Sequence, residues 1–239
     1  MQEILGIRKK EYIQVQEGSG MSYGGSQLFF KPLPDKRSQG KYNGGCGMIA
    51  LGDLLLYLMD KEGKTCTLNG ITYHTVFERK EAYMAYFDEL CRKLKWFPSR
   101  NGMSGVLMAI RFNYMMHKYH LPYRARWGLL ESAREGRIER MLQRDIPVIL
   151  CIPRVLPPFG KNDRLSLYRE QEGKMKQVDK TRAHYVMITG MERDENTGRI
   201  YYRVSSWGRQ YDISVEEYRK FVRTHLLGTV LGNILYISC

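Results

Sequence analysis

A cysteine and a histidine in this sequence have the settings that nucleophilic catalysis requires. Cys46 stands in the run Asn43-Gly-Gly-Cys-Gly, where glycine-rich chain leads into an apolar stretch over 48–59 that predicts a buried helix. A helix N-terminus carries partial positive charge and unpaired N–H groups, which lower a cysteine pKa from about 8.5 into the range of roughly 3.5 to 7.5. We interpret Cys46 as a candidate nucleophile; a structural cysteine at a helix start is the alternative.

A thiol nucleophile needs a neighbouring base, and imidazole is the usual one. His184 opens the apolar run Tyr185-Val-Met-Ile-Thr-Gly, which predicts a buried strand. A polar side chain in a buried strand costs free energy unless it is hydrogen-bonded, so its presence there points to a specific role. We expect surface or half-buried roles for the other histidines, which are His74, His117, His120 and His225. Together with the setting of Cys46, this context favours His184 as the base over a purely structural role.

The elements that would position these two residues differ between the two halves of the chain. Apolar residues at three- and four-residue spacing predict helices after the one at Cys46, over 76–94, 104–120 and 129–143. Apolar, β-branched runs then predict strands over 146–152, 184–191, 200–206 and 229–238. A short helix is expected over 215–224. Helices followed by an antiparallel sheet indicate an α+β fold, with the central N-terminal helix packed on the sheet.

Two further segments complete the expected organisation. Residues 1–45 are rich in Gly, Ser, Pro and Tyr and predict irregular chain, with one extended piece over 27–33. Residues 153–182 hold eight Lys or Arg against four acids, and 166–178 predict a hairpin that would act as a flap before His184. We expect a single domain over 1–239, with a helical part over 46–145 and a β part over 146–239.

Three short segments in this order resemble the papain superfamily of cysteine peptidases. They are the glycine-flanked Cys46 at the start of a buried helix, the run from His184 to Gly190, and Ser205-Ser-Trp-Gly where the family usually has Asn-Ser-Trp-Gly. The runs 139–152 and 212–218 are similar to bacterial members, which include the peptidase domains that trim leader peptides of exported bacteriocins. The resemblance covers residues 39–222.

The resemblance implies a papain-like fold and a thiol peptidase or amidase mechanism. His184 would take the proton of Cys46, the sulfur would attack a peptide-like carbonyl, and water would hydrolyse the thioester. The backbone N–H of Cys46 and one side-chain amide would hold the oxyanion, with Gln39 as the first choice and Asn43 as the reserve. Trp207 would cover the pair and exclude water, although a core tryptophan fits that position equally well.

Ser205 leaves the activity open, because it stands where Asn or Asp normally orients the imidazole. A hydroxyl carries no charge, so both orientation and imidazolium stabilisation are expected to be weaker. The outcome is a slower enzyme, an acceptor supplied by another residue, or a fold that has lost catalysis. Ser206 follows, but side-chain alternation directs it to the opposite face from Ser205. The alternatives to a peptidase are a thiol acyltransferase, whose thioester is resolved by an amine, and a non-catalytic binding module.

The net charge and the cysteine content limit which partners and which cellular compartment are expected. The formal charge of +13 favours anionic partners, and a binding module would present its basic surface to an acidic partner. Lys and Arg are spread along the chain, so nucleic acid is a possible partner but not the favoured one. Five cysteines without a CxxC pair indicate a reducing compartment. We expect no cofactor and no metal, since His117 and His120 lack a second pair of ligands.

No segment predicts insertion into a membrane. The apolar run over 48–59 is interrupted by Asp53 and is too short to cross a bilayer. The N-terminal residues lack the apolar core of a secretory signal. The sequence therefore predicts a cytoplasmic protein, or a secreted one whose signal is not part of this sequence. A peptide or protein is the expected substrate.

Overall fold

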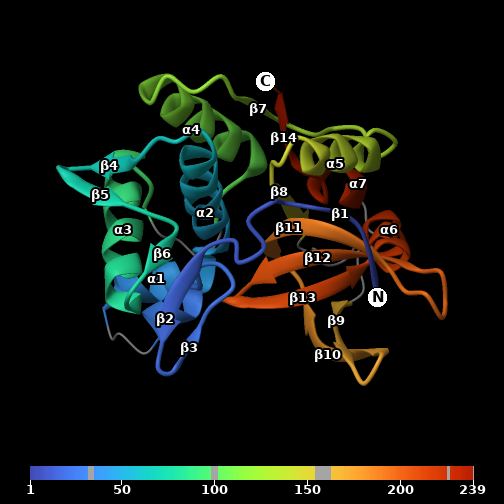
Figure 1. Ribbon diagram of the computed structural model, residues 1–239. Coiled ribbons are helices and arrows are strands. Elements are labelled where there is room, and N and C mark those ends of the chain that lie inside the picture. The colour runs from blue at the N-terminus through green and yellow to red at the C-terminus, as the bar shows by residue number, and fades with distance from the viewer. Residues whose placement is uncertain (32–34, 98–101, 154–162, 225–226, 239) are drawn as a thin grey trace. The chain divides into compact units, whose positions relative to one another are not determined.

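The computed structural model describes residues 1–31, 35–97, 102–153, 163–224 and 227–238 (Figure 1). They form two compact units. The sheet unit comprises Met1–Lys10, Ala125–Ser205 and Gln210–Ser238, and the helical unit comprises Glu11–Arg124 and Ser206–Arg209. The molecule has the α+β composition that the sequence predicts, with helices and a large antiparallel sheet.

The sheet unit is built on one large sheet. Its strands are β1 (Gln2–Gly6), β8 (Val148–Ile152), β9 (Leu165–Gln171), β10 (Lys174–Thr181), β11 (His184–Arg193), β12 (Ile200–Ser206) and β13 (Arg209–Ser214). The order is β1-β11-β12-β13-β9-β10, and β8 also pairs with β11. Since β12 occupies one edge of β11, β8 and β1 follow one another along its other edge. The strands expected over 146–152, 184–191 and 200–206 are confirmed.

The hairpin of β9 and β10 confirms the one predicted over 166–178 and extends it at both ends. Its tip is Glu172-Gly173, and both residues have positive φ, 54° and 73°, which is the requirement of a two-residue type I′ turn. Residues 154–162 of the predicted loop lie outside the described residues. The role of this segment as a flap stays a prediction.

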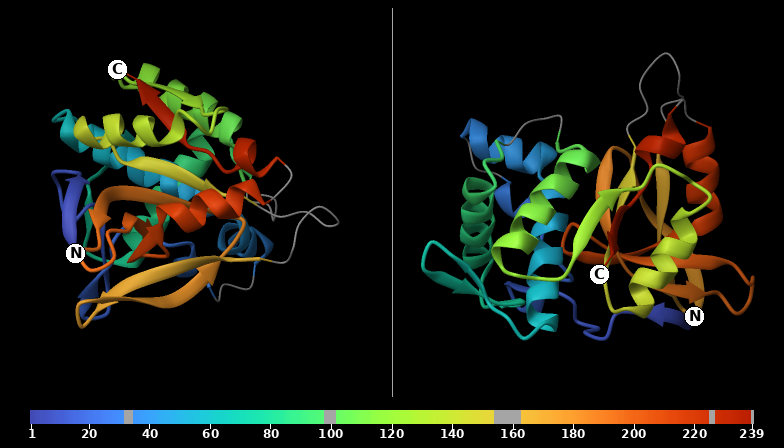
Figure 2. Two further views of the ribbon diagram at one scale, coloured as in Figure 1. Left: turned by 90° about the vertical axis from the view of Figure 1, so that its right-hand side faces the viewer. Right: turned by 90° about the horizontal axis from the view of Figure 1, so that it is seen from above.

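Helices pack on this sheet (Figure 2). α5 (Arg134–Gln143) turns its buried Ile138, Met141 and Leu142 toward β1, β8 and β14 (Leu235–Ser238). α6 (Val215–Arg223) packs on β9 and on the short α7 (Gly228–Leu231). β14 pairs with β7 (Arg124–Trp127) in a separate two-stranded sheet.

α5 belongs to the sheet unit, whereas the sequence predicted it as part of the helical half of the chain. The units divide at Arg124/Ala125, whereas the helical and β parts were expected to divide at 145/146. The reason is that the apolar face of α5 is covered by strands. Two expected elements were also too long: the helix predicted over 129–143 begins at Arg134, and the strand predicted over 229–238 begins at Leu235, after α7.

The helical unit is centred on one buried helix. Its helices are α1 (Lys36–Gly44), α2 (Cys46–Lys61), α3 (Lys80–Lys93) and α4 (Gly105–Lys118). Every residue of α2 from Gly47 to Met59 is buried, as its apolar composition predicts, and α2 contacts both α3 and α4. Two small sheets lie beside them: β2 (Gln14–Glu17), β3 (Gly20–Met21) and β6 (Val76–Phe77) form one, and β4 (Cys66–Leu68) and β5 (Ile71–Tyr73) the other.

The first 45 residues correct the expectation of irregular chain. They contain β1, β2, β3, the 3-10 helix η1 (Gln27–Phe30) and α1. Side-chain caps explain the two helices: Ser26 accepts a hydrogen bond from Leu28 N, and Asp35 accepts one from Ser38 N at 2.9 Å. The extended piece predicted over 27–33 is therefore wrong where it is described, and 32–34 lie outside the described residues. The helix predicted over 76–94 begins only at Lys80, after β6.

Among the described residues, no helix combines the length and the apolar character that crossing a membrane requires.

Candidate active site

Cys46 is the first residue of α2, and its side chain is half-buried. The glycine-rich chain that the sequence places before it is the last turn of α1. Gly45 alone separates the two helices, with φ −77° and ψ −13°. A Cβ added to Gly45 would lie 2.3 Å from the Lys41 carbonyl oxygen. The junction itself therefore requires glycine at this position, whatever Cys46 does.

The field at Cys46 comes from two helix ends. No side chain caps α2, and Ile49 N donates to Gly45 O at 2.9 Å across its first turn, so the N–H groups at the start of the helix can stabilise a negative charge. The C-terminal carbonyl groups of α1 precede them directly and oppose that field. The helix field therefore stabilises a Cys46 thiolate less than it would at the start of a helix that follows a loop.

The two amides predicted for the oxyanion hole lie on α1. Gln39 and Asn43 are both exposed. They are four residues apart, so they share one face of that helix. The structure does not distinguish between them, and both stay candidates.

His184 is the first residue of β11 and is 6% exposed. It pairs with Ile152 of β8. Burial lowers the pKa of the imidazole from 6.5 to about 3, because the charged form loses its hydration. The ring is therefore neutral at pH 7 and can accept a proton, although a pKa this low makes it a weak base. An imidazolium here must be stabilised by a neighbouring anion or by a hydrogen-bond acceptor.

The register of β11 and β12 decides where Ser205 points. Ser205 lies opposite Met187, and paired residues in an antiparallel sheet share a face. Met187 is three residues from His184 in an unbroken strand, so the side chains of Ser205 and His184 point to opposite faces. Ser206, the last residue of β12, alternates to the face that carries His184. This register does not favour Ser205 as the residue that orients the imidazole.

A β-bulge produces this register. The pairing of β11 with β12 shifts between Ile188 and Gly190, so Thr189 is the extra residue of the bulge on β11. With regular pairing from Gly190 onward, Ser205 would stand opposite Ile188 and share the face of His184. One extra residue thus exchanges the faces to which the two serines point, and such a residue cannot be located from the sequence alone.

Trp207 and Gly208 form the two-residue turn between β12 and β13, and both have positive φ, 51° and 73°. Positive φ is costly for a bulky residue such as tryptophan. Within the helical unit two backbone bonds hold the turn: Tyr23 N donates to Gly208 O at 2.8 Å, and Gly208 N donates to Gly25 O at 3.2 Å. These bonds offset the strain and fix where the tryptophan stands.

Asp53 anchors the segment that holds this turn. It is buried in α2 and accepts hydrogen bonds from Tyr83 Oη at 2.6 Å and from Gly25 N at 2.8 Å. Burial raises its pKa to about 7, against the effect of those two bonds. The sequence shows Asp53 only as an interruption of an apolar run. Its bonding partners identify it as a support for the Trp207 turn.

The other cysteines differ from Cys46. Burial raises the pKa of the Cys66 thiol to about 11 and that of Cys91 to about 12. Cys151 is half-buried in β8. No disulfide joins the four cysteines in the described parts of the chain, and the same parts contain no cluster of His, Cys, Asp and Glu that could hold a metal ion. Cys239 and His225 lie outside the described residues.

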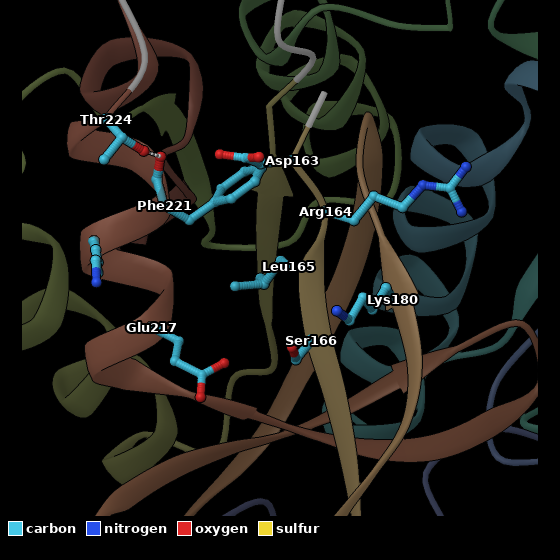
Figure 3. Close-up of a pocket in the computed structure, with 9 residues that line it drawn as sticks. Asp163, Arg164, Leu165, Ser166, Lys180, Glu217, Phe221 and Thr224 are labelled. Carbon is cyan, nitrogen blue, oxygen red and sulfur yellow. Dashed lines mark hydrogen bonds between the residues drawn. The ribbon is translucent and has the colours of Figure 1, made fainter. Parts of the chain in front are cut away.

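A cavity of about 470 Å³ lies in the sheet unit between α6 and the β9–β10 hairpin (Figure 3). It is lined by Asp163, Arg164, Leu165, Ser166, Lys180, Glu217, Lys220, Phe221 and Thr224. In Figure 3 the Arg164 side chain turns away from the cavity. Cations and carboxylates are mixed, and Glu217 already accepts from Tyr168 Oη at 2.6 Å. This lining selects no single class of ligand, and it includes none of the residues predicted for catalysis.

The predicted residues are thus divided between the two units. Cys46, Gln39 and Trp207 belong to the helical unit, and His184 and Ser205 to the sheet unit.

Comparison with known proteins found no relative. No family model, no curated protein and no solved structure matches the chain significantly. The likeness to the papain superfamily therefore rests on the three short motifs.

Proposed function

We propose that the protein is a papain-like cysteine peptidase or amidase, with Cys46 as nucleophile and His184 as base. Two observations support the proposal, one from each unit. Cys46 is the half-buried first residue of a buried helix. His184 opens a buried strand as a neutral imidazole that can accept a proton.

In the proposed reaction His184 acts as a base twice, first on the Cys46 thiol and then on water. The neutral His184 removes the Cys46 proton, and the thiolate attacks the carbonyl carbon of a peptide-like bond. The developing oxyanion is held by the Cys46 N–H and by the Gln39 amide, with Asn43 as the reserve. His184 returns its proton to the departing amine. A water molecule, deprotonated by His184, then attacks the thioester carbonyl; the acid is released, and His184 returns this proton to the departing Cys46 sulfur.

Burial of His184 bears on how the proton is shared. A low imidazole pKa disfavours the imidazolium, so the resting pair holds its proton on sulfur unless the thiolate charge compensates for the lost hydration. The proposal is thus compatible with a thiol that is activated only as the substrate reacts. Five cysteines without a CxxC pair support a reducing, cytoplasmic setting for such a thiol.

A second candidate is a papain-like binding module without catalysis. The register of β12 favours it, because Ser205, at the position where the family usually has Asn, points to the face opposite His184. A binding module has no need of a reactive thiol, so Cys46 chemistry separates the two candidates.

The deciding measurement is the rate of Cys46 alkylation by iodoacetamide as a function of pH. Peptide mass spectrometry reads each cysteine separately, and the half-buried Cys151 is the internal reference. An active pair is expected to give a Cys46 midpoint well below the value of about 8.5 for an ordinary thiol. Cys66 and Cys91 should label slowly, since burial raises their pKa. Labelling of Cys46 no faster than that of Cys151 over pH 5–9, together with no hydrolysis of a peptide substrate, would support the binding module.

The two serines of β12 give a separate test of the register. If Ser206 orients the His184 imidazole in place of Ser205, Ser206→Ala removes one neutral hydrogen bond to that ring. The variant is then expected to lower the rate of Cys46 alkylation at pH 7 by roughly three- to tenfold. Ser205→Ala is expected to change it less than about twofold, because its side chain lies on the other face. Circular dichroism checks that both variants fold. A larger effect of Ser205→Ala than of Ser206→Ala would show that the register argument is wrong.

A further inference from the structure

An arginine-rich surface lies on the sheet unit, on elements that contribute none of the residues of the proposed active site. It is formed by α5, β14 and β7, which are neighbours in Figure 1. We call it the arginine face, and it consists of Arg126, Arg137, Arg140, Arg144 and Tyr236.

Helical geometry gathers three of these arginines. At about 100° per residue, the side chains of Arg137, Arg140 and Arg144 fall within an arc of about 60°. Arg140 and Arg144 are exposed and Arg137 is half-buried. The two acids of α5, Glu135 and Glu139, point about 160° away from Arg137. Glu135 is also bonded to Arg219 of α6. This side of α5 therefore carries positive charge that the helix's own carboxylates do not neutralise.

The strands continue the face beyond α5. Tyr236 stands between the buried Leu235 and Ile237, so it points away from the core. The guanidinium of Arg137 lies 4.8 Å from the centroid of its ring, within the range of a cation–π contact. Arg126 is exposed on β7, the partner strand of β14. The surface thus combines several guanidinium groups with an aromatic ring on which one of them is stacked.

This combination identifies the partner by its chemistry. All the cations of the face are arginine, whose planar fork matches phosphate oxygens and stacks on flat rings. A guanidinium held flat over a tyrosine offers its outer surface to an unpaired base. Single-stranded nucleic acids combine a phosphate chain with exposed bases, and proteins bind them with basic surfaces that include aromatic and arginine stacking.

We propose that the arginine face binds single-stranded nucleic acid, with Arg137 and Tyr236 as a stacking platform and Arg126, Arg140 and Arg144 as phosphate contacts. The surface gives part of the net charge of +13 a specific role. The proposal is independent of catalysis, because it uses neither Cys46 nor His184. Thiol chemistry and nucleic-acid binding can therefore succeed or fail separately.

The test is fluorescence anisotropy with a labelled 20-nucleotide oligouridylate, titrated with the full-length chain at several salt concentrations. Arg137→Ala/Arg140→Ala is expected to weaken binding by about tenfold or more at low salt. It should reduce the slope of log K against log salt by about 0.7, since Arg140 is the phosphate contact that is removed and each such contact on a single strand contributes about 0.7. The matched control is Lys174→Ala/Lys176→Ala, which removes two exposed cations from β10. The control is expected to change affinity by less than about twofold.

A second variant separates stacking from charge. Tyr236→Leu keeps an apolar side chain between β14 and Arg137 and is expected to weaken binding several-fold with an unchanged salt slope. Equal losses in the arginine pair and the lysine control would mean that only net charge matters, and would overturn the proposal. Binding that does not respond to salt would also overturn it. So would poly-glutamate binding as tightly as the oligonucleotide, because the face would then be selective for acidic protein.

Discussion

Replacing His184 with glutamine is expected to slow Cys46 alkylation at pH 6 by about a hundredfold. If the pair holds the Cys46 pKa near 6, about half of the thiol is ionised at that pH, whereas a thiol with a pKa of about 8.5 is ionised to well under 1%. Glutamine keeps a polar side chain of similar size in this buried position and limits the cavity that alanine would leave. Mass spectrometry of the Cys46 peptide gives the rate.

The control for this variant is His74→Gln, which changes an exposed histidine of the helical unit. It should leave the alkylation rate unchanged. Equal alkylation rates in the two variants, together with equal rates of peptide hydrolysis, would contradict the assignment of His184 as base. If His184→Gln lowers hydrolysis of a peptide substrate but leaves the alkylation midpoint unchanged, the proton rests on sulfur until substrate binds.

Replacing Asp212 with asparagine is expected to raise stability at pH 8 and to remove part of the pH dependence of folding. Asp212 is 4% exposed on β13, and its Oδ1 has no hydrogen-bond partner in the described parts of the chain. Burial raises its pKa from 3.8 to about 7, although the positive charge of Arg203 opposes the shift. Asparagine has nearly the same shape and cannot ionise.

The sign follows from proton binding. The folded state holds the Asp212 proton up to about pH 7, whereas the unfolded chain releases it near pH 4. Between these values the folded state binds more protons, so stability falls as pH rises. The whole effect is up to about 4 kcal/mol, from 1.36 kcal/mol per pKa unit. Above pH 7 the wild type carries this cost in full and Asp212→Asn does not.

Urea denaturation at pH 4.5 and pH 8 measures this difference. The advantage of Asp212→Asn over wild type should grow between the two pH values, while the exposed Asp179→Asn on β10 should show no such growth. Asp53, whose pKa burial also raises to about 7, is present in both proteins and cancels from the comparison. An advantage that does not change with pH would show that Asp212 does not titrate in this range.

The sequence by itself determined the elements whose signals are local. The helix from Cys46 is apolar on every side, and α2 is buried on every side. The hairpin predicted over 166–178 is that of β9 and β10, and its tight turn has positive φ at Glu172 and Gly173. The positions of Cys46 at a helix start and of His184 at a strand start could likewise be predicted from the sequence, since each depends on the neighbouring residues.

Only the tertiary structure decided what depends on partners far along the chain. β1 joins the sheet because β11 offers it an edge, and α5 belongs to the sheet unit because β1, β8 and β14 cover its apolar face. The bulge at Thr189 sets the register that turns Ser205 away from the face of His184 and Ser206 toward it. A one-residue shift exchanges the two faces of a strand, and long-range packing, not local propensity, selects it.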